Sequence, residues 1–163
     1  MTNLGYLYRN GQGVDQNYAE ARKWYEKAAA AGNADAMNNL GTLYLGGRGV
    51  AESNTEARKW FEKAAAAGNA YAMTNLGNLY RDGQGVNRDY TEARKWYEKA
   101  ADVGKADAMN NLGTLYLDGR GVTKSNAEAR KWFEKAKATA PNDADVQRTA
   151  DAALNKLGSG KRK

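Results

Sequence analysis

Apolar residues along this chain recur at the 3.6-residue spacing of amphipathic α-helices, in pairs of short segments. In the first segment of residues 33–68, Met37, Leu40 and Tyr44 lie at i, i+3 and i+7, with Gly41 beside them. The second segment carries its own stripe: Ala57, Trp60, Phe61, Ala64 and Ala65. Helices this short cannot bury such stripes alone, so the pattern predicts helix pairs that stack on neighbouring pairs.

The whole pattern repeats every 36 residues without insertion or deletion. Its markers are Leu4-Gly5, Leu40-Gly41, Leu76-Gly77 and Leu112-Gly113, followed by Trp24, Trp60, Trp96 and Trp132. The predicted units cover about 1–32, 33–68, 69–104 and 105–140. We therefore expect an all-α fold, an α/α superhelix of four helix-turn-helix repeats, and we name the two helices of each repeat helix A and helix B.

Residues that cap helices mark the limits of helix B. The candidates for the N-cap are Asn17, Ser53, Asp89 and Ser125, each followed three residues later by Glu. This is the capping-box pattern, in which the side chain accepts a hydrogen bond from a free backbone N–H. Gly32, Gly68 and Gly104 suit the left-handed position after the helix.

The two ends of the chain depart from the repeat. Residues of about 143–157 keep a helical stripe without the Leu-Gly pair, so they predict a capping helix that completes a solenoid domain over 1–157. Residues 158–163 include Lys161, Arg162 and Lys163 and predict a disordered basic tail. At the other end, we expect Leu4, Leu7 and Tyr8 to lie near an uncapped edge.

The segment "RDGQGVNRDY", residues 81–90, has the glycine spacing of a phosphate-binding loop. However, it follows a helix rather than a strand, and the same loop occurs in all four units. We therefore interpret it as a structural turn. Gly83 is expected to end helix A in the left-handed conformation, while Gly85 extends the turn.

Composition narrows the chemistry further. The 163 residues include no His and no Cys, which removes the commonest general base, thiol nucleophiles and the preferred zinc ligands. No carboxylate pair stands apart from the repeat, and no nucleophile or Walker sequence is present. We expect no enzymatic activity, no catalytic or metal site and no cofactor.

Charge and hydropathy give two more expectations. The formal charge is +6, and half of it comes from the last three residues, so nucleic acid is not an expected partner. No apolar run approaches the ~20 residues that span a bilayer, so membrane insertion is not expected.

The unit at 33–68 resembles the Sel-one-like repeat, a relative of the tetratricopeptide repeat. The matching residues are Leu40-Gly41, Leu43-Tyr44, the loop Gly47-x-Gly49-Val50, Ala57, Trp60-Phe61, Lys63-Ala64-Ala65 and Gly68. The resemblance implies a right-handed solenoid that acts as a protein-interaction scaffold or adaptor. It also implies that a peptide or protein partner binds on the concave face, which helix A lines.

Positions of helix A that differ between units are candidates for specificity. The candidate groove residues are Tyr6, Arg9, Asn38, Thr42, Leu45, Tyr71, Thr74, Asn78, Arg81, Asn110, Thr114 and Leu117. Our hypothesis is that Tyr6, Tyr71, Arg9 and Arg81 form an aromatic and cationic surface for a peptide that carries carboxylates. The alternative is a solvated face without a partner.

Other readings stay open. The array could associate end to end with a second copy through its N-terminal edge, as a structural element. The alternation of Tyr25, Phe61, Tyr97 and Phe133 gives a larger period of 72 residues, which is consistent with recent duplication or with deliberate design.

Overall fold

The computed structural model describes residues 1–159, and all the regular structure in this range is helical. The helices are α1 (Thr2–Asn10), α2 (Tyr18–Ala30), α3 (Ala34–Leu45), α4 (Asn54–Ala66), α5 (Ala70–Asp82), α6 (Tyr90–Asp102), α7 (Ala106–Asp118), α8 (Asn126–Thr139) and α9 (Ala144–Ser159). Odd-numbered helices up to α7 are the predicted helices A, and even-numbered helices are helices B. The predicted all-α superhelix of helix pairs is confirmed.

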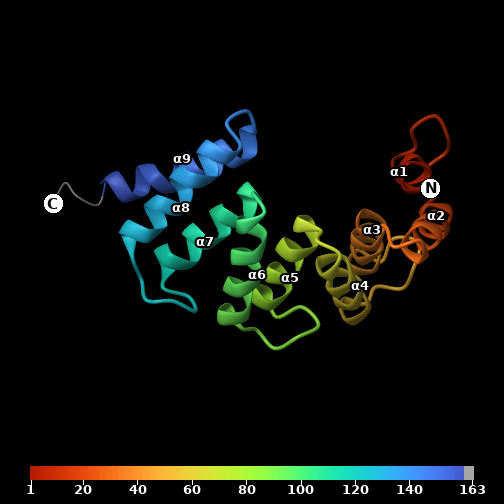
Figure 1. Ribbon diagram of the computed structural model, residues 1–163, viewed down its shortest axis with the longest axis horizontal. Coiled ribbons are helices and arrows are strands. Elements are labelled where there is room, and N and C mark those ends of the chain that lie inside the picture. The colour runs from red at the N-terminus through yellow and green to blue at the C-terminus, as the bar shows by residue number, and fades with distance from the viewer. Residues whose placement is uncertain (160–163) are drawn as a thin grey trace.

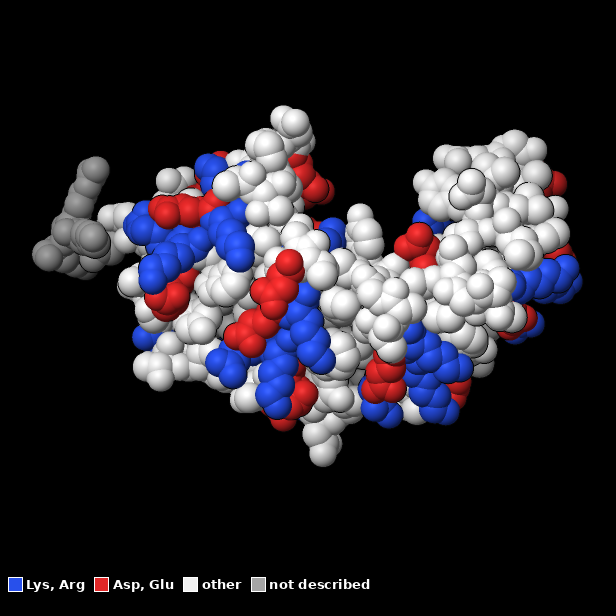
Figure 2. Space-filling model, in the orientation of Figure 1, with Lys and Arg blue, Asp and Glu red and all other residues white. Residues whose placement is uncertain are grey.

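Each helix packs against the next one along the chain, so the repeats form a row (Figure 1). The row curves, and the N-terminal repeat and α9 rise on the same side of the molecule. Between them the space-filling view is hollowed (Figure 2), and α1, α3 and the upper end of α5 border this hollow in Figure 1.

The Leu-Gly pair has a specific packing role. A Cβ placed on Gly41 would lie 2.5 Å from Cε1 of Phe61, which is fully buried. The same relation joins Gly5 to Tyr25, Gly77 to Tyr97 and Gly113 to Phe133. Glycine is therefore required here because the aromatic ring of helix B lies directly on the backbone of helix A.

The four tryptophans are less buried than their helical spacing suggests. Trp60 belongs to the predicted apolar stripe of helix B, but it and its three equivalents are only half-buried. Trp60 packs from α4 against the cluster formed by α2 and α3, and its other side carries Lys63, whose Nζ lies 4.5 Å from the ring centroid. The fully buried aromatic position is that of Phe61, one residue further along.

The predicted caps are present. Side-chain oxygens of Asn17, Ser53, Asp89 and Ser125 accept hydrogen bonds from backbone N–H groups in the first turn of each helix B. Gly83 ends α5 with φ 72° and lies in the left-handed region, as expected. Two further caps were not predicted: the side chains of Asn33 and Asn69 accept hydrogen bonds from backbone N–H groups in the first turns of α3 and α5.

The second loop glycine does more than extend the turn. A Cβ on Gly85 would lie 2.7 Å from Cβ of Asn54, the first residue of the preceding helix B. Gly49 and Gly121 approach Tyr18 and Tyr90 in the same way, whereas Gly13 has nothing within 4 Å. We call the start of each helix B, on which a loop of the following repeat can lie, the loop seat.

Helix α9 takes the place of a fifth helix A and packs on α8 and α7. It runs to Ser159, so Gly158 and Ser159 belong to the helix and not to the expected tail; residues 160–163 of that tail lie outside the described residues. At the other end, Leu4, Leu7 and Tyr8 are half-buried, and Tyr8 packs against the core cluster formed by α2 and α3.

Candidate functional site

The twelve candidate residues of helix A separate into groups that differ in accessibility. Asn38, Thr74 and Asn110 occupy one repeat position, on the side that faces the next helix A. Asn38 accepts a 3.0 Å hydrogen bond from Nδ2 of Asn75. Thr74 and Asn110 are only 8% and 6% exposed. These two residues are therefore inside the packing between repeats, where a partner does not reach them.

Helix α9 covers part of the expected groove on the fourth repeat. Nδ2 of Asn110 donates to the backbone oxygen of Val146 at 3.2 Å. Leu117 packs against the cluster that contains Phe133 and Leu157. Leu45 is also partly buried, against the core between α4 and α5. Of the fourth-repeat candidates, only Thr114 is exposed.

The first repeat presents an aromatic ring beside a cation. Tyr6 is 44% exposed, and the guanidinium carbon of Arg9 lies 5.1 Å from its ring centroid. Nη1 of Arg9 donates to Oδ1 of Asn39 on the next helix A at 3.3 Å, and Nε donates to Asn10 at 3.4 Å. Both partners are neutral amides, and no carboxylate of the described residues pairs with Arg9. Its positive charge is therefore available to an acidic group.

Arg81 is the equivalent of Arg9 two repeats later, but it is already engaged. Its Nε and Nη2 donate to the two carboxylate oxygens of Asp82 at 2.7 and 2.8 Å. This fork lowers the pKa of Asp82 and raises the pKa of Arg81. A carboxylate from a partner would have to displace Asp82, so Arg9 is the better receptor of the two.

A buried tyrosine hydroxyl lies behind each of these arginines. The hydroxyl of Tyr97 donates to Oδ1 of Asn78 at 2.7 Å. In the first repeat, the outward-facing Tyr6 occupies the repeat position of Asn78. The buried hydroxyl of Tyr25 has no hydrogen-bond partner among the described residues. Burial raises the pKa of both hydroxyls, against the opposing effect of the nearby arginine. The 72-residue alternation contained this signal, because Tyr replaces Phe at these two positions only.

Tyr71 is the second exposed ring of this face, at 59%. Nζ of Lys105 lies 4.0 Å from its ring centroid, and the same ammonium group pairs with Asp107 at 2.6 Å. At the start of the same helix, Asn69 caps α5 and donates to Asp35 of the repeat before at 2.7 Å. Tyr71 thus lies in a row with two carboxylates, between α3 and α7. Thr42 completes the outward-facing set and is half-buried.

The helix-B side of the molecule carries paired charges. Helices B carry ion pairs at i, i+3 and i, i+4, such as Lys59–Glu56 at 2.6 Å and Arg58–Glu62 at 2.9 Å. Figure 2 shows positive and negative groups side by side over the lower and left-hand parts of the molecule. No group of three potential metal ligands occurs in residues 1–159, and no helix there is long and apolar enough to cross a membrane.

Comparison with known proteins places this arrangement in a family. The profile of the Sel1 repeat matches residues 1–33, 34–69, 70–105 and 106–138. The chain belongs to the Sel1 repeat family. Proteins with Sel1 repeats generally mediate protein–protein interactions, and the family is generally a non-catalytic repeat scaffold. No curated protein matches the chain.

Solved structures agree with this assignment. A Sel1 repeat protein from Oxalobacter formigenes is 32% identical, with a TM-score of 0.83 over 99% of this chain and 72% of that one. A protective antigen with an SLR fold from uropathogenic Escherichia coli is 42% identical, with a TM-score of 0.80 over 85% of this chain. This chain spans only 30% of that antigen. Cysteine rich protein B of Helicobacter pylori, at 24% identity and a TM-score of 0.58, shares the fold over 77% of this chain and 93% of its own.

Proposed function

We propose that this Sel1 repeat chain is a non-catalytic adaptor that binds a peptide or protein segment on the helix-A face of its first three repeats. The observation that carries the proposal is the pair of exposed tyrosines, Tyr6 and Tyr71, each beside a cation. Tyr6 and Tyr71 are 44% and 59% exposed, whereas the helix-B side carries mainly paired charges. Rigid aromatic rings beside cations are typical anchors of binding interfaces.

The chemistry of this face indicates a partner with both acidic and apolar groups. Arg9 offers a guanidinium that pairs with no carboxylate of the described part of the chain, so it can form a charge-assisted hydrogen bond with an acidic side chain or a terminal carboxylate of a partner. The rings of Tyr6 and Tyr71 provide amphipathic contact area with little conformational entropy to lose.

The packing of α9 sets the limit of the proposed surface. Since Asn110 and Leu117 lie against α9 or its cluster, the face extends over α1, α3 and α5 rather than over all four repeats. The same helix occupies the place where an added helix A would stack. We therefore favour a heterologous partner over end-to-end association.

The experiment begins with a displayed library of random peptides, selected against the folded chain. The affinity of the selected peptides is then compared between the wild type and the variant Arg9→Ala/Tyr71→Ala. Loss of two anchor residues should weaken binding about tenfold or more. The matched control is Lys59→Ala, which removes an exposed cation from α4 and should leave the affinity unchanged. Equal affinity of the wild type and the double variant would contradict the proposal.

A further inference from the structure

An open pocket of about 690 Å³ lies at the C-terminal end, between the start of α8 and the end of α9. Its lining consists of Leu117, Lys124, Asn126, Ala127, Arg130, Lys131, Lys156 and Leu157. The volume lies within the ordinary range of ligand sites in proteins. It is separate from the helix-A face described above, although Leu117 lies at its edge.

The repeat explains why this pocket exists. In each of the first three repeats, the first residue of helix B is covered by the second loop glycine of the following repeat, as Tyr90 is covered by Gly121. The residue 36 positions after Gly121 is Leu157, which is part of α9 rather than of a loop. Within residues 1–159, no loop therefore reaches Asn126, the first residue of α8. The pocket is the fourth loop seat, left open because the chain continues as a helix.

The open seat has cationic walls and an apolar floor. The walls carry Lys124, Arg130, Lys131 and Lys156, and no carboxylate is among the lining residues. Two acids of α8 offset part of this charge from outside the lining: Glu128 pairs with Lys131 at 2.6 Å, and Glu134 lies 3.9 Å from Arg130. The apolar floor is formed by Leu117, Ala127 and Leu157.

We propose that the open loop seat is a second binding site, which takes an acidic segment of a partner protein with an aliphatic residue among its carboxylates. The other three seats hold a segment of polypeptide chain, so the shape suits a peptide. Carboxylates complement the positive charge of Lys124 and Arg130, and an aliphatic side chain covers the floor, whose burial from water is favourable. A small anion would leave that floor exposed.

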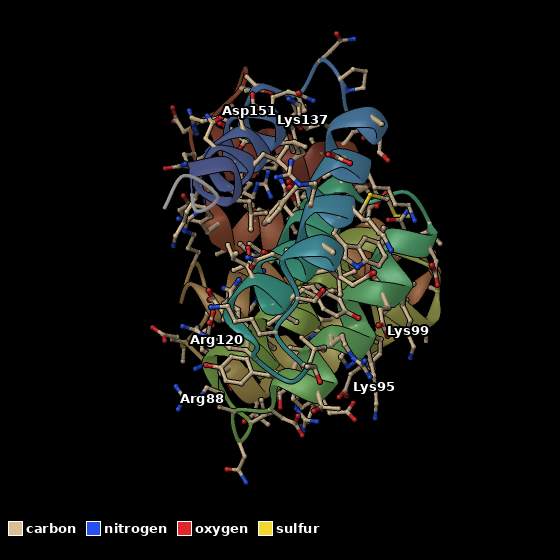
Figure 3. All side chains as sticks on the ribbon, turned by 90° about the vertical axis from the view of Figure 1, so that its left-hand side faces the viewer. Arg88, Lys95, Lys99, Arg120, Lys137 and Asp151 are labelled. Atoms are coloured by element: carbon tan, nitrogen blue, oxygen red, sulfur yellow. The ribbon has the colours of Figure 1, made fainter. Side chains whose placement is uncertain are left out.

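The third repeat supplies a matched control for this site. Arg88 and Arg94 stand at the same repeat positions as Lys124 and Arg130, but their seat is filled. Arg88 and Arg120 lie on the ring of Tyr90 at 5.7 and 5.6 Å from its centroid, and they are seen together at the lower left of Figure 3, which views the molecule from this end. Charge reversal at the two pairs alters net charge equally, yet only one pair borders an open pocket.

The test is fluorescence anisotropy of the whole chain with a labelled peptide of alternating glutamate and leucine, and with its glutamine–leucine counterpart. The wild type should prefer the acidic peptide, and added salt should weaken that preference. Lys124→Glu/Arg130→Glu should lower the affinity about tenfold, while Arg88→Glu/Arg94→Glu should change it by less than about twofold. The exposed single change Lys124→Gln, expected to lower the affinity severalfold, serves if the double variant melts early.

Three results would overturn the proposal. The first is equal binding of the acidic and neutral peptides by the wild type, including no binding of either. The second is a similar loss of affinity in both double variants, which would show a general effect of net charge. The third is unchanged affinity in a folded Lys124→Glu/Arg130→Glu variant.

Discussion

The hydroxyl of Tyr97 donates a 2.7 Å hydrogen bond to Asn78, whereas the equivalent hydroxyl of Tyr25 is buried and has no hydrogen-bond partner within residues 1–159. The other two repeats have Phe at this position, so the surrounding packing accepts a ring without a hydroxyl. Tyr25→Phe should therefore raise the free energy of unfolding by up to about 1 kcal/mol, and Tyr97→Phe should lower it by about 1 kcal/mol. Urea denaturation of the two variants measures both values. The same sign for both would contradict this account of the two hydroxyls.

The free energy of unfolding at alkaline pH should depend on the same two hydroxyls, those of Tyr25 and Tyr97. Burial raises the pKa of both hydroxyls above the ordinary value of 10.0. Above about pH 10 the unfolded chain loses these protons while the folded chain keeps them, so the unfolded state binds fewer protons and the free energy of unfolding falls as pH rises. Denaturation at a series of pH values should show this fall. The Tyr25→Phe/Tyr97→Phe variant should lose part of the slope, and an unchanged slope would exclude these tyrosines as its source.

Replacement of the helix-A glycine tests the contact with the aromatic ring. In Gly41→Ala the new Cβ would lie 2.5 Å from the ring of Phe61, so a helix or the ring must shift. We expect the free energy of unfolding to fall by about 1–3 kcal/mol. Gly158→Ala is the control, because a Cβ there meets nothing within 4 Å. It should be neutral or slightly stabilising, since alanine favours helix over glycine. Comparable losses in both variants would refute the packing role of Gly41.

The loop seat can be measured with a second pair of glycines. Gly13 and Gly85 both have positive φ, at 72° and 68°, so alanine strains the backbone similarly at each. Only at Gly85 would the new Cβ also collide with Asn54, at 2.7 Å. Gly85→Ala should therefore be more destabilising than Gly13→Ala by about 1 kcal/mol or more. Thermal melts of the two variants give the difference, and equal values would show that the seat contributes nothing.

The repeat made most of the fold predictable. Leu-Gly, Trp and the capping residues recur at fixed spacing, so helix pairs, their order and the caps at Ser53 and Asp89 follow from the chain itself. The orientation of Trp60 was harder to predict from the sequence, because Trp60 and Phe61 both lie on the apolar stripe. Helical period alone does not say which of two adjacent aromatic residues points at the backbone of helix A.

The candidate site was predicted less completely. The period places Asn38, Thr74 and Asn110 on an outward side of helix A, but the angle between neighbouring helices decides whether the next repeat covers that side. The covering of Asn110 by α9 depends on that angle too. By contrast, Arg81 and Asp82 are adjacent in sequence, so their pairing could have been anticipated.

The central claim is that a partner lies across the helix-A face of the first three repeats. The most direct measurement is the map of backbone and side-chain NMR shift changes when a selected peptide is added to the folded chain. The account predicts changes centred on Tyr6, Arg9, Thr42, Tyr71 and Asn78, with the even-numbered helices largely unaffected. Changes confined to α2, α4 and α6, or to the pocket between α8 and α9, would contradict it.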